Sequence, residues 1–203
     1  MASFYSISSF VRTNYPEYWG EQEYPVGSCV AIHKVSERWG IFSNFAPASL
    51  TVEGVAFRSS EELFQVLKFS DPSIVRRILD GVTLGDKPCH NCKMAAKSYE
   101  RSCRRPDWGS MVIDAMKYCL MQKHAQCEPF RQALADSIGR TIVEDQTSFS
   151  KRHADAWGVK RQGDTFVGPN LLGRLLMELR DNGTLSYRLP DDALSAIRGC
   201  LDA

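Results

Sequence analysis

Residues 59–69, with the sequence SSEELFQVLKF, form the stretch that most constrains the fold. Ser59 is followed three residues later by Glu62, and this Ser-x-x-Glu spacing is the capping box that begins many helices. The same stretch supplies an apolar packing side, made of Leu63, Phe64, Val66 and Leu67. The sequence therefore predicts a helix over 59–69 with one face in the core.

A polar stripe runs along the same predicted helix. Glu61, Gln65 and Lys68 are spaced i, i+4 and i+7, so they share one face. The capping box explains Glu62 and leaves Glu61 without a structural role. A carboxylate, an amide and an amine could point into a shared cleft, or the stripe could be an ordinary solvated face. Spacing alone favours the solvated face, because charged stripes are common on helices.

Patterns outside this helix predict a mixed, mainly helical α+β domain with a few short strands. Strands are expected at 29–35 and 141–145, and a tight hairpin at 51–57 around Glu53-Gly54. Further helices are expected at 71–81, 91–103, 108–124, 128–137, 171–180 and 191–201. The helix at 171–180 is expected to be capped by Asn170 and stopped by Asp181-Asn182-Gly183. Residues 1–28 are interpreted as an irregular arm with one or two extended pieces, preceding a single domain at 29–203. Residues 146–169 lack periodicity, and a connection of this length favours a functional loop.

Composition narrows the class of protein. The 203 residues are 24% charged and 10% aromatic, as in a globular domain, and the formal net charge of +1 excludes binding to nucleic acid by bulk charge. No apolar run approaches the roughly 20 residues of a membrane helix, and the N-terminus does not resemble a signal peptide. We therefore expect a cytoplasmic protein with no membrane association and no obligate protein partner. The seven cysteines are expected to be reduced, and most of them buried.

Basic residues gather in one segment despite the neutral total. Residues 86–131 contain nine Lys/Arg and five Asp/Glu, a local charge of +4 against −3 elsewhere. Arg101, Arg104 and Arg105 directly precede Trp108, so guanidinium groups could grip a phosphate while the indole stacks on a base or sugar. A solvated helix end beside a core tryptophan is an equally good interpretation.

Two further motifs have a possible chemical role. Cys89-x-x-Cys92 followed by His124-x-x-Cys127 is a moderate match to zinc-ligand spacing, but free thiols are favoured, so we expect no metal and no cofactor. In the long loop, His153, Asp155 and Trp157-Gly158 precede Gly168-Pro169-Asn170. This arrangement suits an anion or sugar site at a helix start, or a surface loop with one anchoring tryptophan.

Taken in order, these pieces resemble the NADAR (YbiA-like) family of N-glycosidases over about residues 40–180. The resembling pieces are Phe42-Ser43-Asn44-Phe45, Ser60-Glu61 with Phe64-Gln65-x-x-Lys68-Phe69, Trp108, Val143-Glu144, Trp157-Gly158, and Gly168-x-Asn170-x-x-Gly173-Arg174-x-Leu176-Met177-Glu178-x-Arg180. No single piece is specific, but the ordered set is.

The resemblance implies chemistry at an N-glycosidic bond of ribose C1. It implies catalytic roles for Glu61, for Trp108 and for an acidic residue of the loop, and it makes Lys68 a candidate amine that traps the opened ribose as a Schiff base. The family usually has Asp three residues before the Trp-Gly pair. Here that position is Ala154, and Asp155 comes one residue later.

The same resemblance, together with the residue chemistry above, indicates a set of substrate-binding candidates. They are Asn44, Phe45, Gln65, Arg104, Arg105, Trp157, Gly158, Asn170 and Arg174. The leading hypothesis is an enzyme that removes ADP-ribose from ADP-ribosylated guanine in DNA or RNA. The N-terminal arm and the +4 segment favour such a large phosphodiester ligand over a phosphoribosyl small molecule.

Three alternatives remain open. The first is a hydrolase of phosphoribosylamino-pyrimidine intermediates of riboflavin synthesis, the second a non-catalytic ADP-ribose or nucleotide reader, and the third a small zinc-stabilised interaction module. For an enzyme, the residue types suit the reaction, because cleavage builds positive charge at C1 that a carboxylate can stabilise. Glu61 lies in the first helical turn, where the dipole favours its anion, so it suits a base or charge stabiliser.

Overall fold

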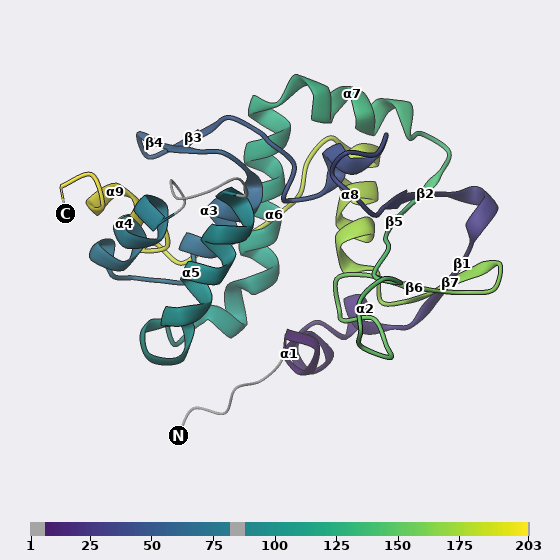
Figure 1. Cartoon of the computed structure of the whole chain (residues 1–203), viewed down its shortest axis with the longest axis horizontal. Helices are drawn as coiled ribbons and strands as arrows, with labels where there is room; N and C mark the ends of the chain where they lie inside the picture. Colours follow the sequence, from purple (N-terminus) through teal and green to yellow (C-terminus); the bar gives the residue numbers. More distant parts are fainter. Residues whose placement is uncertain (1–6, 82–87, 203) are drawn as a thin grey trace. The chain divides into compact units, whose positions relative to one another are not determined.

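The computed structural model describes residues 7–81 and 88–202 (Figure 1), and their contacts form two compact units. Unit 1 contains residues 7–43 and 132–185. Unit 2 contains residues 44–81, 88–131 and 186–202. Helices and strands occur together, which confirms the α+β class. Over the described ranges, no helix combines the length and apolar character needed to cross a bilayer.

The first described residues of unit 1 are regularly folded. They form α1 (Ile7–Asn14), α2 (Pro16–Trp19), β1 (Gln22–Pro25) and a 3-10 turn, η1 (Val26–Ser28). The expected irregular arm is therefore wrong for residues 7–28, although β1 is one of the expected extended pieces. These elements are too short to show a hydrophobic period in the sequence. Val11, which is fully buried, anchors α1.

A three-stranded antiparallel sheet joins this N-terminal segment to the C-terminal half of unit 1. Its strand order is β1-β7-β6, with β6 at Lys160–Gln162 and β7 at Thr165–Gly168. The expected loop over 146–169 is thus wrong in its second half, because strands of three and four residues are too short to show alternation. In the sheet, Tyr24 lies opposite Phe166, and Phe166 packs with Val143 and Val159.

A parallel strand pair forms the other part of unit 1. Here β2 (Cys29–Ile32) pairs with β5 (Thr141–Glu144), which confirms both predicted strands, although β2 ends three residues early. Helix α8 (Leu171–Asn182) packs against β5 and ends at Gly183, whose φ of 71° is the left-handed conformation expected at a helix end. A 3-10 turn, η2 (Gly40–Phe42), completes the unit.

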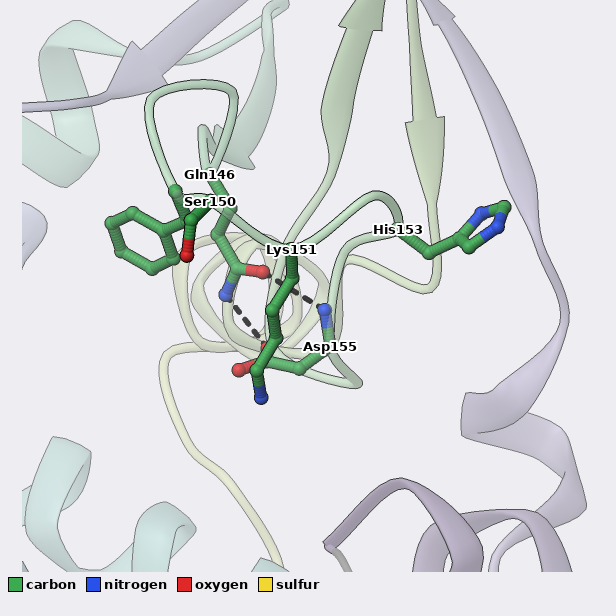
Figure 2. Close-up of a pocket in the computed structure, with 6 residues that line it drawn as sticks. Gln146, Ser150, Lys151, His153 and Asp155 are labelled. Carbon is green, nitrogen blue, oxygen red and sulfur yellow. Dashed lines mark hydrogen bonds between the residues drawn. The ribbon is translucent and has the colours of Figure 1, made fainter.

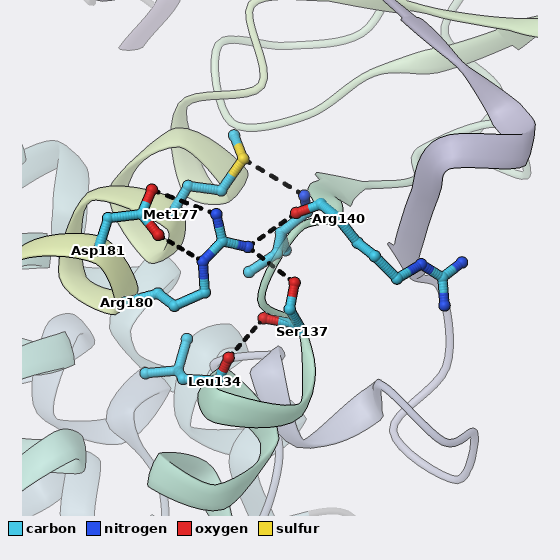
Figure 3. Close-up of polar contacts among 7 residues, drawn as sticks. Leu134, Ser137, Arg140, Met177, Arg180 and Asp181 are labelled. Atoms are coloured by element: carbon cyan, nitrogen blue, oxygen red, sulfur yellow. Dashed lines mark hydrogen bonds and ion pairs between the residues drawn. The ribbon is translucent and has the colours of Figure 1, made fainter.

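The end of α8 also holds the turn that leads into β5 (Figure 3). Arg180 donates hydrogen bonds to the carbonyl oxygens of Ser137 at 3.0 Å and Arg140 at 2.7 Å, and it is itself paired with Asp181 at 2.7 Å. The turn follows α7 (Glu128–Asp136), a helix that the sequence predicts. The guanidinium therefore satisfies carbonyl groups that the turn leaves without helical partners.

Unit 2 is mainly helical. It contains the hairpin β3 (Leu50–Val52) and β4 (Val55–Phe57), and the helices α3 (Ser60–Val66), α4 (Pro72–Gly81), α5 (Pro88–Cys103), α6 (Trp108–Gln126) and α9 (Ser195–Gly199). Glu53 and Gly54 both have positive φ, at 52° and 80°, which confirms the tight turn. Helix α3 packs against both α5 and α6. It is therefore an interior element of unit 2.

The starts of α3 and α6 in unit 2 differ in how they are capped. Ser59 accepts a hydrogen bond from the Glu62 backbone N–H at 3.2 Å, as the capping box predicts. The Glu62 carboxylate accepts from the N–H of Arg58 at 2.7 Å, one residue before the expected donor. Asp107 occupies the N-cap position of α6 without capping it, because its carboxylate is bound by Arg105 at 2.6 and 2.9 Å.

Candidate functional site

The polar stripe of α3 is buried. Glu61 is 5% exposed and Gln65 is 2% exposed, so the solvated face that spacing favoured is wrong. Packing of α3 between α5 and α6 removes both side chains from water, which a single-helix pattern cannot show. The Gln65 side-chain amide donates to a Glu61 oxygen at 2.8 Å, and the buried side-chain oxygen of Gln65, Oε1, has no hydrogen-bond partner among the described residues. A buried polar atom without a hydrogen bond lowers the stability of the fold, and such atoms are often found at functional sites.

Asn44 holds the start of α3. Its carbonyl oxygen accepts from the backbone N–H of Glu61 at 2.9 Å, and its side-chain oxygen accepts from the Ser60 hydroxyl at 3.0 Å. Its amide also donates to the sulfur of Met116 in α6 at 3.1 Å. Asn44 is itself 6% exposed, so these contacts fix where Glu61 sits. The neighbouring Phe45 is half-buried, with the Lys93 amine 5.2 Å from its ring centre.

Lys68 lies in the turn just after α3 and forms an ion pair with Glu100 of α5. The Lys68 side chain is 12% exposed and that of Glu100 is 23% exposed, so the pair is largely shielded from solvent. Sequence reasoning missed Glu100, since 32 residues separate it from Lys68 and only the packing of α3 on α5 joins them. The structure therefore adds a carboxylate next to the candidate amine.

Two aromatic rings flank this ion pair. Trp108, at the first position of α6, is 7% exposed and meets Phe64 edge to face, with ring centres 5.2 Å apart. The Lys68 amine lies 5.9 Å from the Phe64 ring centre and 6.0 Å from that of Trp108. Cation–π attraction at these distances stabilises the charged amine beside the rings. Glu61, Gln65, Lys68, Glu100 and Trp108 will be called the α3 cluster.

The arginines before Trp108 are placed differently from one another. Arg105 is 4% exposed and its guanidinium is bound by the carboxylates of Asp107 and Asp192, which raise the pKa of Arg105. Its backbone N–H donates to the Lys68 carbonyl at 2.8 Å, so it also braces the turn after α3. Arg104 is half-buried in an isolated bridge with Phe69. Arg105 thus has two carboxylates where a phosphate was expected.

Burial shifts two titrations near the cluster. The pKa of Glu62 is raised by desolvation, which its hydrogen bond from Arg58 only partly offsets. The pKa of Cys119 is also raised by burial and further by the charge of Glu61. This thiol is therefore inert at neutral pH.

Asp155, the loop acid, belongs to unit 1. Its carboxylate accepts from the Gln146 amide at 2.7 Å and from the Trp157 backbone N–H at 2.9 Å, and its own N–H donates to Gln146 at 2.9 Å. Gln146 was not among the candidates from the sequence. Both residues line a cavity of about 430 Å³ (Figure 2). The cavity is lined by Gln146, Phe149, Ser150, Lys151, His153 and Asp155.

The other unit 1 candidates have clear packing roles. Asn170 is fully buried at the start of α8, where its side chain bonds to the backbone of β5. A Cβ atom on Gly158 would lie 2.5 Å from the Glu144 carbonyl oxygen, so only glycine fits there. Arg174 donates to the Glu17 carbonyl at 2.6 Å and lies 5.4 Å from the Tyr18 ring centre. Trp157 is half-buried, and its carbonyl accepts from Leu172 at 3.0 Å.

The zinc motif gathers no metal site in the part of the chain that can be examined. Across the described residues, no group of three His, Cys, Asp or Glu side chains comes together. Cys92 and Cys127 are buried and are not in disulfide bonds, and the side chain of Cys89 lies outside the described residues.

The mixed helix and strand fold described above is that of a known protein family. The model of the NADAR domain matches residues 32–182, and the chain belongs to this family. The elements named above from Ile32 to Asn182, including all of the α3 cluster, fall within the match.

Similar proteins carry names that concern N-glycosidic or riboflavin chemistry. The chain is 30% identical over 159 residues to the N-glycosidase YbiA of Escherichia coli (strain K12), covering 75% of this chain and 86% of that protein. It is 28% identical over 178 residues to a riboflavin biosynthesis protein of Vibrio vulnificus (strain YJ016), covering 87% of this chain but 42% of that protein. The chain thus spans less than half the length of the Vibrio protein.

A solved structure supports the fold. The NMR structure of E. coli YbiA matches with a TM-score of 0.58 at 28% identity, covering 76% of this chain and 84% of that one.

Proposed function

We propose that this chain is an N-glycosidase that hydrolyses the bond between ribose C1 and a nitrogen, with ADP-ribosylated guanine in DNA or RNA as its substrate. Membership of the NADAR family and relatives named N-glycosidase support the reaction class. The observation that carries the proposal is the buried Glu61 carboxylate, which accepts a hydrogen bond from the neutral amide of Gln65.

A neutral partner orients Glu61 without cancelling its charge. Lys68, the cation on the same helix face as Glu61, forms its ion pair with Glu100 instead. Departure of the base leaves positive charge on C1 and the ring oxygen, and a fixed anion in a site shielded from water stabilises that charge strongly. In the hydrolysis, a water oxygen bonds to C1 and its proton passes to Glu61. The C1–N bond breaks, and its electron pair stays on the guanine nitrogen.

Lys68 offers a second route. In this route the ribose ring opens, which leaves C1 joined to the guanine nitrogen as an imine, and the Lys68 amine adds to C1. The C1–N bond to guanine then breaks, with its electron pair and a proton going to the guanine nitrogen, and water hydrolyses the remaining Lys68–C1 imine to the free sugar and the amine. The amine must first lose a proton, and Glu100 is positioned to accept it because the two are ion-paired. Phe64 and Trp108 form an aromatic wall beside the amine that suits a sugar or base.

The first experiment compares two adjacent glutamates. The protein is incubated with an oligonucleotide that carries ADP-ribosylated guanine, and release of ADP-ribose is measured. Glu61→Gln is expected to lower turnover by about 10²–10⁴-fold, the range for a positioned acid or base. Glu62→Gln is the matched control, because Glu62 caps α3 and should lose stability rather than turnover. Absence of release by the unmodified protein contradicts the proposal.

A second experiment separates the two routes. Sodium borohydride reduces an imine to a stable amine, so the Lys68 route predicts a covalent sugar adduct detectable by mass spectrometry. Lys68→Arg keeps the charge and should keep the pairing with Glu100, but it cannot form the imine. Turnover without any adduct, retained by Lys68→Arg, assigns the reaction to direct attack by water.

Hydrolysis of a phosphoribosylamino-pyrimidine is the second candidate function. The similarity to the Vibrio riboflavin biosynthesis protein, which extends over 87% of this chain, favours it. A parallel assay that measures release of ribose 5-phosphate from the pyrimidine substrate decides between the two functions. The preferred substrate has the higher kcat/KM. The catalytic contribution of Asp155 stays a prediction in either case.

A further inference from the structure

The loop that follows β5 carries side chains that contribute nothing to the core. Phe149 is 53% exposed, which is unusual for a large aromatic side chain. Lys151, Arg152 and His153 are also exposed. Within the described ranges, none of these three side chains takes part in a hydrogen bond or ion pair. The polar groups of these three side chains are therefore available to bind a ligand.

The loop is held in shape from beneath. Gln146 and Asp155 exchange hydrogen bonds of 2.7 and 2.9 Å across it, as Figure 2 shows. Lys160 of β6 donates to the Phe149 carbonyl at 2.6 Å. The backbone that presents Phe149 is thus fixed at both ends, and ordering it on binding should cost little.

A cavity lies among these side chains. Its volume of about 430 Å³ is within the range of small-ligand sites, and its lining includes Phe149, Lys151 and His153. An aromatic face next to the Lys151 amine matches the two parts of a nucleotide, a base with a π-face and a phosphate with a negative charge.

The charge of the loop points to the same kind of ligand. Residues 147–161 contain four Lys or Arg and a single acid, Asp155, whose carboxylate is already engaged by Gln146 and the Trp157 N–H. Phe149 is the one large apolar side chain in this range that is counted as exposed. One isolated ring is too small an apolar patch for a protein partner or a bilayer.

We propose that the Phe149–His153 loop binds one nucleotide of a single-stranded nucleic acid, with the base stacked on Phe149 and the phosphodiester against Lys151 and Arg152. The inference deepens the proposed function, on which it rests for its biological meaning, by locating where a strand that contains the modified guanine is held.

The test uses an unmodified, fluorescently labelled single-stranded 10-mer, with binding followed by anisotropy at several salt concentrations. Phe149→Ala is expected to weaken binding by roughly 5- to 150-fold, the range for one stacked base. Lys151→Ala/Arg152→Ala should reduce the slope of log K against log salt by about 1.4, because each phosphate contact on a single strand contributes about 0.7. Lys34→Ala/Arg77→Ala, which removes two exposed cations elsewhere, is the control and should leave the slope unchanged.

The outcome is independent of the proposed reaction, because the 10-mer carries no ADP-ribosyl group to release. A protein that releases no ADP-ribose but shows these effects refutes the glycosidase and keeps the strand-binding loop. The inference is overturned if the intact protein fails to bind the 10-mer, or if both loop variants bind with the affinity and salt slope of the control.

Discussion

Asn170→Ala tests whether this buried amide holds the fold or binds substrate. Asn170 is fully buried, and its side chain joins the start of α8 to β5 by two hydrogen bonds. Its oxygen accepts from the Glu144 N–H at 3.0 Å, and its nitrogen donates to the Ile142 carbonyl at 2.9 Å. Its φ is 54°, a left-handed conformation that asparagine tolerates better than alanine.

The expected loss follows from these contacts. Alanine leaves one donor and one acceptor of β5 buried without a partner, at about 1–3 kcal/mol each. The left-handed conformation adds about 1 kcal/mol for alanine. The free energy of unfolding should therefore fall by about 3–7 kcal/mol, a large share of the stability of an ordinary domain.

Urea unfolding followed by circular dichroism measures this loss. Asn170→Gly is the matched control, since it removes the same two hydrogen bonds but adopts the positive φ without strain, so its loss should be smaller. The reasoning is refuted if Asn170→Ala unfolds at the same urea concentration as the unmodified protein. Unchanged stability with a raised KM would assign Asn170 to substrate binding.

Three further predictions concern unit 2. Arg105→Ala should lower the free energy of unfolding by about 1–2 kcal/mol, a modest value because solvent screens the exposed carboxylates that bind it; thermal unfolding checks this, and an unchanged melting temperature opposes it. Arg105 lowers the pKa of Asp107 below 3.8, so the ionised carboxylate stabilises the fold above that pH and the contribution is lost as pH falls through the lowered value. Asp107→Asn should therefore lose less stability than the unmodified protein between pH 5 and pH 3 in urea titrations. Glu53 also accepts a hydrogen bond from Arg198 at 2.8 Å, so the turn is tested in an Arg198→Ala background. In that background Glu53→Asn should raise stability by about 0.5–1 kcal/mol, because asparagine suits the positive φ of the hairpin turn; a lower melting temperature would count against it.

Local signals in the sequence were sufficient for most elements. The Ser59 cap, the Glu53-Gly54 turn and the glycine stop of α8 each depend on neighbours within a few residues, so they could be predicted. The α1 helix and the β6–β7 hairpin could not, because elements of three to eight residues carry too little periodicity.

The candidate site was predictable in part for the same reason. Helical spacing places Glu61 and Gln65 together, and the structure joins them. Burial of the stripe, and the pairing of Lys68 with Glu100, depend on how α3 packs against other helices. Arg105 has a local partner in Asp107, two residues away, but its second partner, Asp192, is 87 residues away. Contacts at such separations leave no local pattern.

The parallel pairing of β2 with β5 has a consequence for biosynthesis. Cys29 pairs with Thr141, so β2 leaves the ribosome about 110 residues before its partner strand exists. At typical elongation rates this interval lasts roughly 6–20 s. Throughout it, the apolar Val30 and Ile32 lie on a strand with an open edge, the kind of segment that aggregates. We therefore expect β2 to stay unpaired until Thr141–Glu144 has emerged, so unit 1 can complete its fold only late in synthesis.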